Sequence, residues 1–283
     1  MALLVIALAG VIMAATARRS CLEAVAANTA LEDLRRRWGA LSLQRALADR
    51  CEEMILAAEA AGEIRIEGPV TRVEHRLKLA GMDWRLVVAD EQAKANVNAI
   101  HLRQGDAGVR AALTQLLGAD LAGSAVALRP TPATDPRRKQ TRPYGSLGQV
   151  FDGDWAGGLL RPPDSRPAGI DRITCWGDGR INLRRACPEA LRAATVGALD
   201  ETQVGKLLAM REDIPGLSLS EALDRLELTR RQRAAAEAVL TGRSGCHSLW
   251  IVGRTSQRQW RRLVVVEASS QQGGSAGIEV LVW

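Results

Sequence analysis

The chain opens with an apolar block that has no polar stripe. Residues 2–17 (ALLVIALAGVIMAATA) carry no charge, and Arg18 and Arg19 close the block. A helix of this length rises about 25 Å, close to the roughly 30 Å hydrocarbon core of a bilayer. A helix that docks on a soluble core normally has a polar side as well. The pattern therefore predicts a membrane segment over residues 1–17.

Helical periodicity continues beyond this block, but it becomes amphipathic. Charged side chains take the remaining faces, and no proline interrupts the pattern before Pro69. Gly62 is a typical residue at which a helix ends. We therefore predict one long helix over residues 1–61, whose apolar stripe requires a partner. The stripe comprises Leu31, Leu34, Trp38, Leu41, Leu47, Cys51, Met54 and Ala58.

Alternation of apolar and polar residues then replaces the helical pattern. The segment 70–79 alternates in the manner of a half-solvated antiparallel strand, and Ala80-Gly81 marks a tight turn. A helical insertion into one sheet explains strands at both ends of the chain more economically than three separate domains. The predicted strands cover residues 63–67, 70–79, 82–89, 248–252, 261–267 and 277–282.

The long middle of the chain lacks strand patterns and contains well-marked helices. A helical face runs over residues 106–117, and a proline-rich loop over 124–143 carries the basic run 137–139. Three capping boxes then indicate a compact bundle of about four short helices. Their residue pairs are Asp200 with Gln203, Ser218 with Glu221, and Thr229 with Gln232.

Together these patterns predict an α+β protein with four parts. A long helix (1–61) precedes the first strands (62–89), and the final strands (247–283) complete the same sheet. The inserted, mainly helical domain spans residues 90–246 and contains the bundle at 187–241.

The composition excludes some classes of protein but does not identify the function. The 283 residues are 47% hydrophobic and 25% charged, which is typical of a packed protein and excludes disorder as the main state. The net charge of +6 keeps a basic, helix-hairpin-helix-like nucleic-acid-binding protein as an alternative, with residues 195–200 as its hairpin. That hairpin supplies a single glycine, and one Tyr and one Phe are too few for a base-stacking platform.

Candidate catalytic and redox chemistry is sparse. A membrane-anchored hydrolase would need Asp152 and Asp154 together with His101 or His247, but no G-x-S-x-G nucleophile motif occurs. The five cysteines show no zinc-site spacing. In an exported protein, Cys175 and Cys187 are candidates for a disulfide.

Two short motifs are weakly similar to each other. They are residues 88–98 (VADEQAKANVN) and 176–183 (WGDGRINL). Each places acidic or Asp-Gly turn residues before a basic residue and then an Asn between apolar neighbours, which suits a turn followed by a capped junction. The residues concerned are Asp90, Glu91, Lys94, Asn96 and Asn98 in the first motif, and Gly177, Asp178, Gly179, Arg180 and Asn182 in the second.

With these motifs the chain resembles, over essentially its whole length, the K-type minor pseudopilins of bacterial type II secretion systems, the general secretion pathway protein K family. Most other pseudopilins carry Glu at the fifth mature position, whereas the K type typically lacks it, and Val5 stands there if Met1 approximates position one. The second motif departs from the family at Arg184, where a further Asn is common.

The resemblance implies a pilin-like fold and a non-enzymatic role in fibre assembly and protein secretion at the tip of the pseudopilus. The implied partners are the I-type and J-type minor pseudopilins, the inner-membrane secretion platform and the membrane itself, but no nucleic acid. The membrane and helix-packing residues would be Leu3, Leu4, Val5, Ile6, Leu8, Val11 and Ile12.

The resemblance also implies a location and a candidate ion. The chain would cross the inner membrane once and expose its large domain to the periplasm, with a preceding basic leader supplying the cytoplasmic charges. No catalytic residue and no organic cofactor are implied. Some family members bind calcium, which takes six to eight oxygen ligands. The candidate ligands here are Asp152, Asp154, Asp164 and Asp171.

Overall fold

The computed structural model describes residues 1–61, 71–118, 126–132, 142–152, 169–214, 216–255, 259–267 and 277–282. In chain order its larger elements are α1 (Ala2–Leu47), α2 (Cys51–Ala61), β1 (Arg72–Leu79), β2 (Met82–Asp90), α3 (Val97–Leu117), α6 (Pro188–Thr195), α7 (Glu201–Asp213), α8 (Leu219–Asp224), α9 (Arg230–Val239), β7 (Cys246–Arg254), β8 (Gln259–Glu267) and β9 (Gly277–Val282). Short elements between them are the 3-10 turns η1 (Ala48–Arg50), η2 (Glu91–Ala93), η3 (Leu147–Gln149) and η4 (Gly169–Asp171), and the two-residue strands β3 (Ala95–Asn96), β4 (Ile173–Thr174), β5 (Ile181–Asn182) and β6 (Leu240–Thr241).

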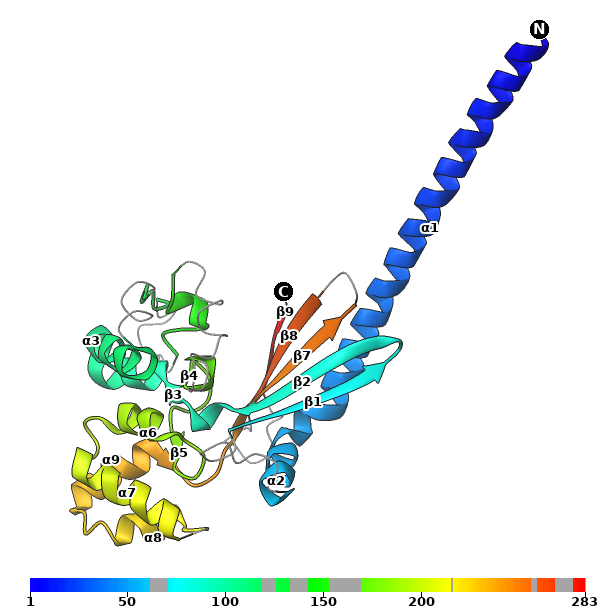
Figure 1. The fold of residues 1–283 in the computed structure, drawn as a ribbon. Coiled ribbons are helices and arrows are strands. Elements are labelled where there is room, and N and C mark those ends of the chain that lie inside the picture. The colour runs from blue at the N-terminus through cyan, green and yellow to red at the C-terminus, as the bar shows by residue number, and fades with distance from the viewer. Residues whose placement is uncertain are drawn as a thin grey trace.

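The amino-terminal helix extends well beyond the rest of the molecule (Figure 1). Within α1 the buried residues lie near its end, at Gly39, Ala40 and Leu43. The predicted long helix over residues 1–61 is confirmed, with one 3-10 turn, η1, between α1 and α2. A 3-10 turn advances side chains by a different angle from an α-helix, so η1 changes the face that meets the sheet. Ala48 and Cys51 are both buried after this change.

Five antiparallel strands form one sheet in the order β1-β2-β7-β8-β9. Strands β2 and β7 are direct neighbours, with Trp84 opposite Gly253, although residues 91–245 lie between them in the chain. The predicted α+β fold, with one sheet interrupted by a mainly helical segment, is therefore confirmed. The strand predicted over residues 63–67 lies outside the described residues.

Trp84 fastens the helix to the sheet. Its buried indole ring meets Gly39 of α1 and Gly253 of β7, where a Cβ atom would come within 2.5 Å and 2.9 Å of ring carbons respectively. Its Nε1 donates a hydrogen bond to the carbonyl of Leu79 at 3.2 Å. The absence of side chains at the two glycines thus lets the helix approach the strand pair closely.

The inserted segment has an apolar core distinct from that of the helix and sheet. One cluster of buried side chains, including Ile100, Leu191 and Leu207, lies wholly between Ala95 and Leu240. A second cluster joins α1 and α2 to the sheet, around Ile55. The two clusters share no residue among those described.

The expectation that strand structure stops between residues 90 and 246 is wrong in detail. The two-residue strands β3 and β4 pair in parallel, as do β5 and β6. Such short pairs contain too few residues to show an alternating pattern. They join segments of the insertion that are distant in sequence.

The helices of the insertion follow the sequence closely. Helices α6 to α9 form the predicted bundle, and all three capping boxes are present. Helix α3 begins earlier than the predicted residue 106 and is broken by Gly105, whose φ of 66° is left-handed. Glycine adopts that conformation without a steric penalty, which explains the break.

The disulfide considered for Cys175 and Cys187 does not form, and all five cysteines are thiols. Burial raises the pKa of Cys187, to which the backbone N–H of Ala190 is hydrogen-bonded. The carbonyl of Cys175 accepts a hydrogen bond from Asn98. Each cysteine is held in place by the packing of the insertion without a covalent link between them.

Candidate functional site

The apolar amino-terminal segment lies outside both cores. Every residue predicted to enter the membrane is exposed: Leu3, Leu4, Val5, Ile6, Leu8, Val11 and Ile12 are between 57% and 82% accessible. The helix is long and apolar enough to cross a membrane, and the most apolar window has none of its residues buried within the molecule. By itself, a helix of this kind at the start of a chain is weak evidence for a membrane span.

Apolar exposure continues along α1 after the two arginines. Leu22, Val25, Leu34 and Trp38 are between 51% and 63% accessible. Single exposed apolar residues are common, but a series along a projecting helix provides surface for neighbouring helices or lipid. The helix surface before the sheet is therefore a candidate packing surface.

The first of the two similar motifs, residues 88–98, forms a tight, buried turn at the end of β2. The carboxylate of Asp90 accepts hydrogen bonds from the backbone N–H groups of Gln92 and Ala93 at 2.9 and 3.2 Å, and so caps η2. Glu91 is 1% exposed and pairs with Lys94 at 2.6 Å. Hydroxyl groups from two other strands also donate to the Glu91 carboxylate, namely Thr174 at 2.5 Å and Ser248 at 2.6 Å.

The second motif forms an exposed turn whose backbone requires glycine. Gly177 and Gly179 have φ values of 89° and 86°, a backbone conformation that residues other than glycine rarely adopt. The carboxylate of Asp178 accepts from the backbone N–H of Arg180 at 3.0 Å and pairs with its guanidinium. The turn is thus held by its own Asp and Arg.

The fold brings the two motifs into contact. Asn96 caps α3 through the N–H of Ala99 and donates to the carbonyl of Trp176 at 2.6 Å. Gln92 donates to Asp178 at 2.7 Å across 86 residues of chain. From the second motif, Asn182 accepts from the N–H of Arg184 and donates to Asp90. The weak internal similarity of the motifs therefore corresponds to two turns that share hydrogen bonds.

The first motif also extends into the insertion through Asn98. Its Nδ2 donates to the carbonyls of Tyr144 and Cys175 at 2.9 and 2.7 Å, and its Oδ1 accepts from the N–H of Tyr144. These bonds give both the NH2 group and the carbonyl oxygen of the buried Asn98 amide a hydrogen-bond partner. Asn98 thus ties three chain segments of the insertion together.

Arg185, which the sequence did not single out as a functional residue, lies at the centre of this region. Its side chain is 4% exposed and pairs with Glu59 at 2.7 Å, Glu52 at 2.8 Å and Asp90 at 3.2 Å. Burial alone would lower the pKa of Arg185, but hydrogen bonds to Glu59 and Glu52 raise it. The guanidinium therefore joins helix α2, the end of β2 and the insertion.

His247 of β7 completes this group, which we call the junction cluster: Glu52, Glu59, Asp90, Arg185 and His247. Its Nε2 lies 2.7 Å from Oε2 of Glu52. Burial alone would raise the pKa of Glu52, but hydrogen bonds from His247 and Arg185 outweigh it and lower the pKa to about 2. No sequence signal links these residues, because they are separated by up to 195 positions.

The described residues do not fit a calcium site at the candidate positions. Asp152 pairs with Arg129 at 3.0 Å, and Asp171 pairs with Arg72 at 3.1 Å. The described part of the chain holds no group of three or more His, Cys, Asp or Glu side chains arranged to bind a metal. Asp154 and Asp164 lie outside the described residues.

The groups required for a hydrolase are dispersed. His101 lies beside Asp106 at 3.1 Å and the hydroxyl of Tyr144 at 3.2 Å. The contacts of His247 are with Glu52, whereas Asp152 is held by Arg129. Within the described ranges, neither histidine pairs with Asp152.

The hairpin considered for nucleic-acid binding uses its backbone internally. Between α6 and α7, the N–H groups of Ala198 and Leu199 both donate to the carbonyl of Thr195. They are therefore not free to bind a phosphate group in the manner of a helix-hairpin-helix. The basic run at residues 137–139 lies outside the described residues.

Comparison with known proteins found similarity at the level of solved structures. No family model and no curated protein matches the chain. Among solved structures, the chain is similar to one in the GspK-GspI-GspJ complex from the type 2 secretion system of enterotoxigenic Escherichia coli. The sequence identity is 14% and the TM-score 0.43, over 87% of this chain and 97% of that chain.

Proposed function

We propose that the protein is a K-type minor pseudopilin, a non-enzymatic subunit at the tip of the pseudopilus that acts in fibre assembly and secretion. It crosses the inner membrane once, with its large domain in the periplasm. It assembles with the I-type and J-type minor pseudopilins and the inner-membrane platform, and it does not bind nucleic acid. The two family motifs, residues 88–98 and 176–183, support this proposal through the resemblance.

One observation carries the proposal: an exposed apolar helix is continuous with the helix that packs on the sheet. Leu4 and Leu8 are 70% and 58% accessible, whereas Leu43 on the same helix is buried. Apolar area removed from water stabilises an assembly by about 25 cal/mol per Å². A helix with this distribution gains free energy by entering a membrane first and then packing among similar helices.

The insertion gives the subunit its proposed position in the fibre. Residues 91–245 leave the sheet at the end of β2 and return at β7, and they enclose a core of their own. In Figure 1 this segment lies at the end of the sheet opposite to the projecting helix. A body of that size prevents a further subunit from stacking above it, which suits the tip of a fibre.

The decisive experiment replaces Leu4 and Leu8 with Asp. On insertion scales, each charged residue at the centre of a membrane helix raises the free energy of insertion by about 2.5–3.5 kcal/mol. We expect the Leu4→Asp/Leu8→Asp variant to lose membrane association in cell fractionation and to stop co-purifying with the I-type and J-type subunits.

The matched control carries the same two charges on other exposed apolar positions. Leu102 and Val196 are 46% and 48% accessible and lie in the insertion. Leu102→Asp/Val196→Asp should remain in the membrane fraction. Persistence of membrane association and complex formation in the Leu4→Asp/Leu8→Asp variant would refute the mechanism.

A further inference from the structure

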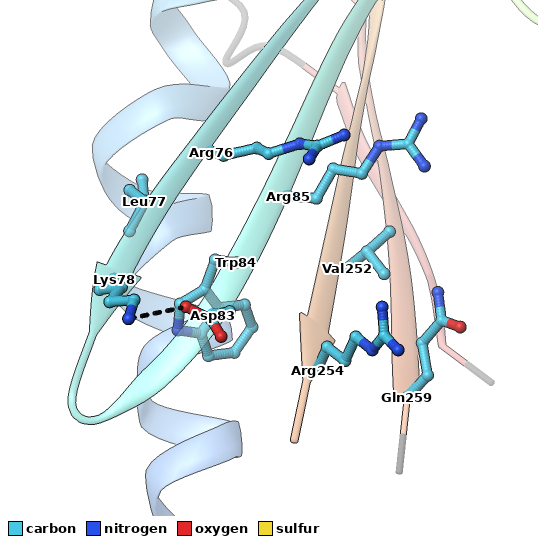
Figure 2. A pocket seen from close by; sticks show the side chains of 9 residues that line it. All are labelled: Arg76, Leu77, Lys78, Asp83, Trp84, Arg85, Val252, Arg254 and Gln259. Carbon is cyan, nitrogen blue, oxygen red and sulfur yellow. Dashed lines mark ion pairs between the residues drawn. The ribbon is translucent and has the colours of Figure 1, made fainter. Parts of the chain in front are cut away.

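The sheet face turned away from α1 and α2 carries a dense set of basic side chains. Residues such as Val73, Leu86 and Ile251 pack into the core with the helices. Residues that alternate with these along the strands, such as Arg76, Arg85 and Val252, line a hollow of about 640 Å³ that spans β1, β2, β7 and β8 (Figure 2). An adjoining hollow of about 230 Å³ shares Arg85 with it.

We call this surface the basic sheet face and define it by six of the seven cations that line the two hollows: Arg72, Arg76, Lys78, Arg85, Arg254 and Arg261. The seventh, Lys94, is buried and pairs with Glu91. Three carboxylates lie among them, at Glu74, Asp83 and Asp171. The face therefore has twice as many cations as anions.

These cations are only partly neutralised within the chain. Glu74 is shared, accepting from Arg85 at 2.7 Å and Arg76 at 3.2 Å while lying 3.6 Å from Arg72. Among the described residues, Arg254 and Arg261 form no ion pair. Within the described part of the chain, two guanidinium groups at the β7 and β8 side of the hollows thus have no carboxylate partner.

The register places like charges against each other. Arg76 lies directly opposite Arg85 on the neighbouring strand, and Val252 separates Arg85 from Arg261 in the same row. Like charges opposite each other destabilise a strand pair. Glu74 offsets this repulsion in part, and an added anion would relieve the rest.

We propose that the basic sheet face binds an acidic segment of a partner protein, whose carboxylates pair with Arg85, Arg254 and Arg261. Guanidinium groups bind carboxylates through two parallel hydrogen bonds, which makes arginine well suited to this role. Between these arginines, Val252 and the half-buried Trp250 supply an apolar floor for the stems of Glu and Asp side chains.

The geometry disfavours other anionic partners. Anionic lipid is too far away if residues 1–17 lie in a membrane. Gly39, which meets Trp84 beside the larger hollow, lies about 30 Å further along the helix than residue 17. At physiological ionic strength, charges are screened beyond about 8 Å. For nucleic acid, Trp84, which lines the larger hollow, is 2% exposed and cannot stack on bases. A second copy of this chain carries the same net charge of +6.

Charge reversal of Arg254 and Arg261 tests the proposal on the full chain in non-ionic detergent. The probe is a fluorescein-labelled, glutamate-rich peptide, and the readout is fluorescence anisotropy. We expect binding that weakens as salt rises, and a loss of affinity of about tenfold or more in the Arg254→Glu/Arg261→Glu variant.

The control variant makes the same charge change elsewhere. Arg230 and Arg231 are exposed at the start of α9, so Arg230→Glu/Arg231→Glu alters net charge equally and should change affinity less than about twofold. If thermal unfolding shows that the first variant is not folded, Arg254→Gln/Arg261→Gln replaces it.

Four results would overturn the proposal. They are an equal loss of affinity in both variants, no peptide binding at low salt, tighter binding of single-stranded DNA than of the peptide through the same arginines, and displacement of the peptide by anionic lipid vesicles. Loss of membrane association in the Leu4→Asp/Leu8→Asp variant bears on the proposed function alone, because that variant leaves the basic sheet face unchanged.

Discussion

Arg185 shows how one buried cation determines the arrangement of several acidic residues. Glu52, Glu59 and Asp90 come from two separate elements, and all three pair with this guanidinium. Without it, the buried Asp90 and the partly exposed Glu52 and Glu59 would lose the cation that they share, and breaking a buried ion pair typically costs about 3–5 kcal/mol. The cluster therefore provides a reason for the insertion to remain attached to the helix and sheet in one orientation.

The lowered pKa of Glu52 predicts a pH-dependent stability. Because its pKa in the folded state is about 2, below the ordinary 4.5, the ionised carboxylate stabilises the fold above pH 4.5. This contribution is lost as the pH falls from about 4.5 towards 2. We expect Glu52→Gln to lower the unfolding temperature at neutral pH and to flatten its decline in acid, as measured by circular dichroism.

Glu53 supplies the matched control on the same helix. It is exposed and outside the junction cluster. Glu53→Gln should retain the acid dependence of the unmodified protein. An unchanged acid profile in Glu52→Gln would show that this carboxylate does not link folding to pH.

At the scale of elements, the contact between α1 and the sheet depends on a missing side chain. Trp84 is held by the hydrogen bond to Leu79 and by glycines on both sides, so its ring has little room to move. Local helix propensity favours Ala over Gly at position 39, whereas packing favours Gly. The two effects oppose each other at this residue.

We expect packing to win, because a Cβ at Gly39 would lie 2.5 Å from the Trp84 ring. Gly39→Ala should lower the free energy of unfolding by about 1–3 kcal/mol, the usual cost of overpacking. Gly205→Ala in the exposed face of α7 has nothing within 4 Å and should raise stability by about 0.5–1 kcal/mol. Denaturant unfolding of both variants measures the difference, and a stabilised Gly39→Ala protein would contradict this account.

The helices of the insertion show what local sequence can specify. Asp200, Ser218 and Thr229 each accept from the backbone three residues later, as the capping-box pattern predicts. Those contacts involve neighbours in the chain, so they form without tertiary help. The break at η1 was not predicted because the apolar spacing across it is compatible with one continuous helix.

At the scale of the whole molecule, the two larger apolar cores predict regional responses to mutation. Leu207 belongs to the core of the insertion and Ile55 to the core under the sheet, and both are 0% exposed. Truncation of a buried Leu or Ile to Ala typically costs about 2–5 kcal/mol. Because these two cores are separate, we expect each substitution to destabilise mainly the region around its own core.

Hydrogen exchange with mass spectrometry measures this directly. Leu207→Ala should speed exchange in α6 to α9 and leave β2 and β7 near their original rates, whereas Ile55→Ala should do the reverse. Equal acceleration everywhere in both variants would mean that the chain unfolds as a single cooperative unit.

Sequence alone determined the features that depend on near neighbours and periodicity. The apolar opening segment, the alternation in β1 and the capped helices follow from repeats of 3.6 or 2 residues and from short-range hydrogen bonds. The strand patterns at both ends of the chain also predicted that early and late strands share one sheet, and the resemblance to K-type minor pseudopilins added the expectation of a pilin-like fold.

Only the tertiary structure decided which distant residues meet. Arg185 lies 133 positions from Glu52, Asn182 lies 92 from Asp90, and the basic sheet face combines four strands. Such contacts depend on strand register and chain direction, and a shift of one residue would turn every side chain of a strand to the opposite face. Burial and charge pairing across the fold therefore selected these partners, and no local pattern in the chain encodes them.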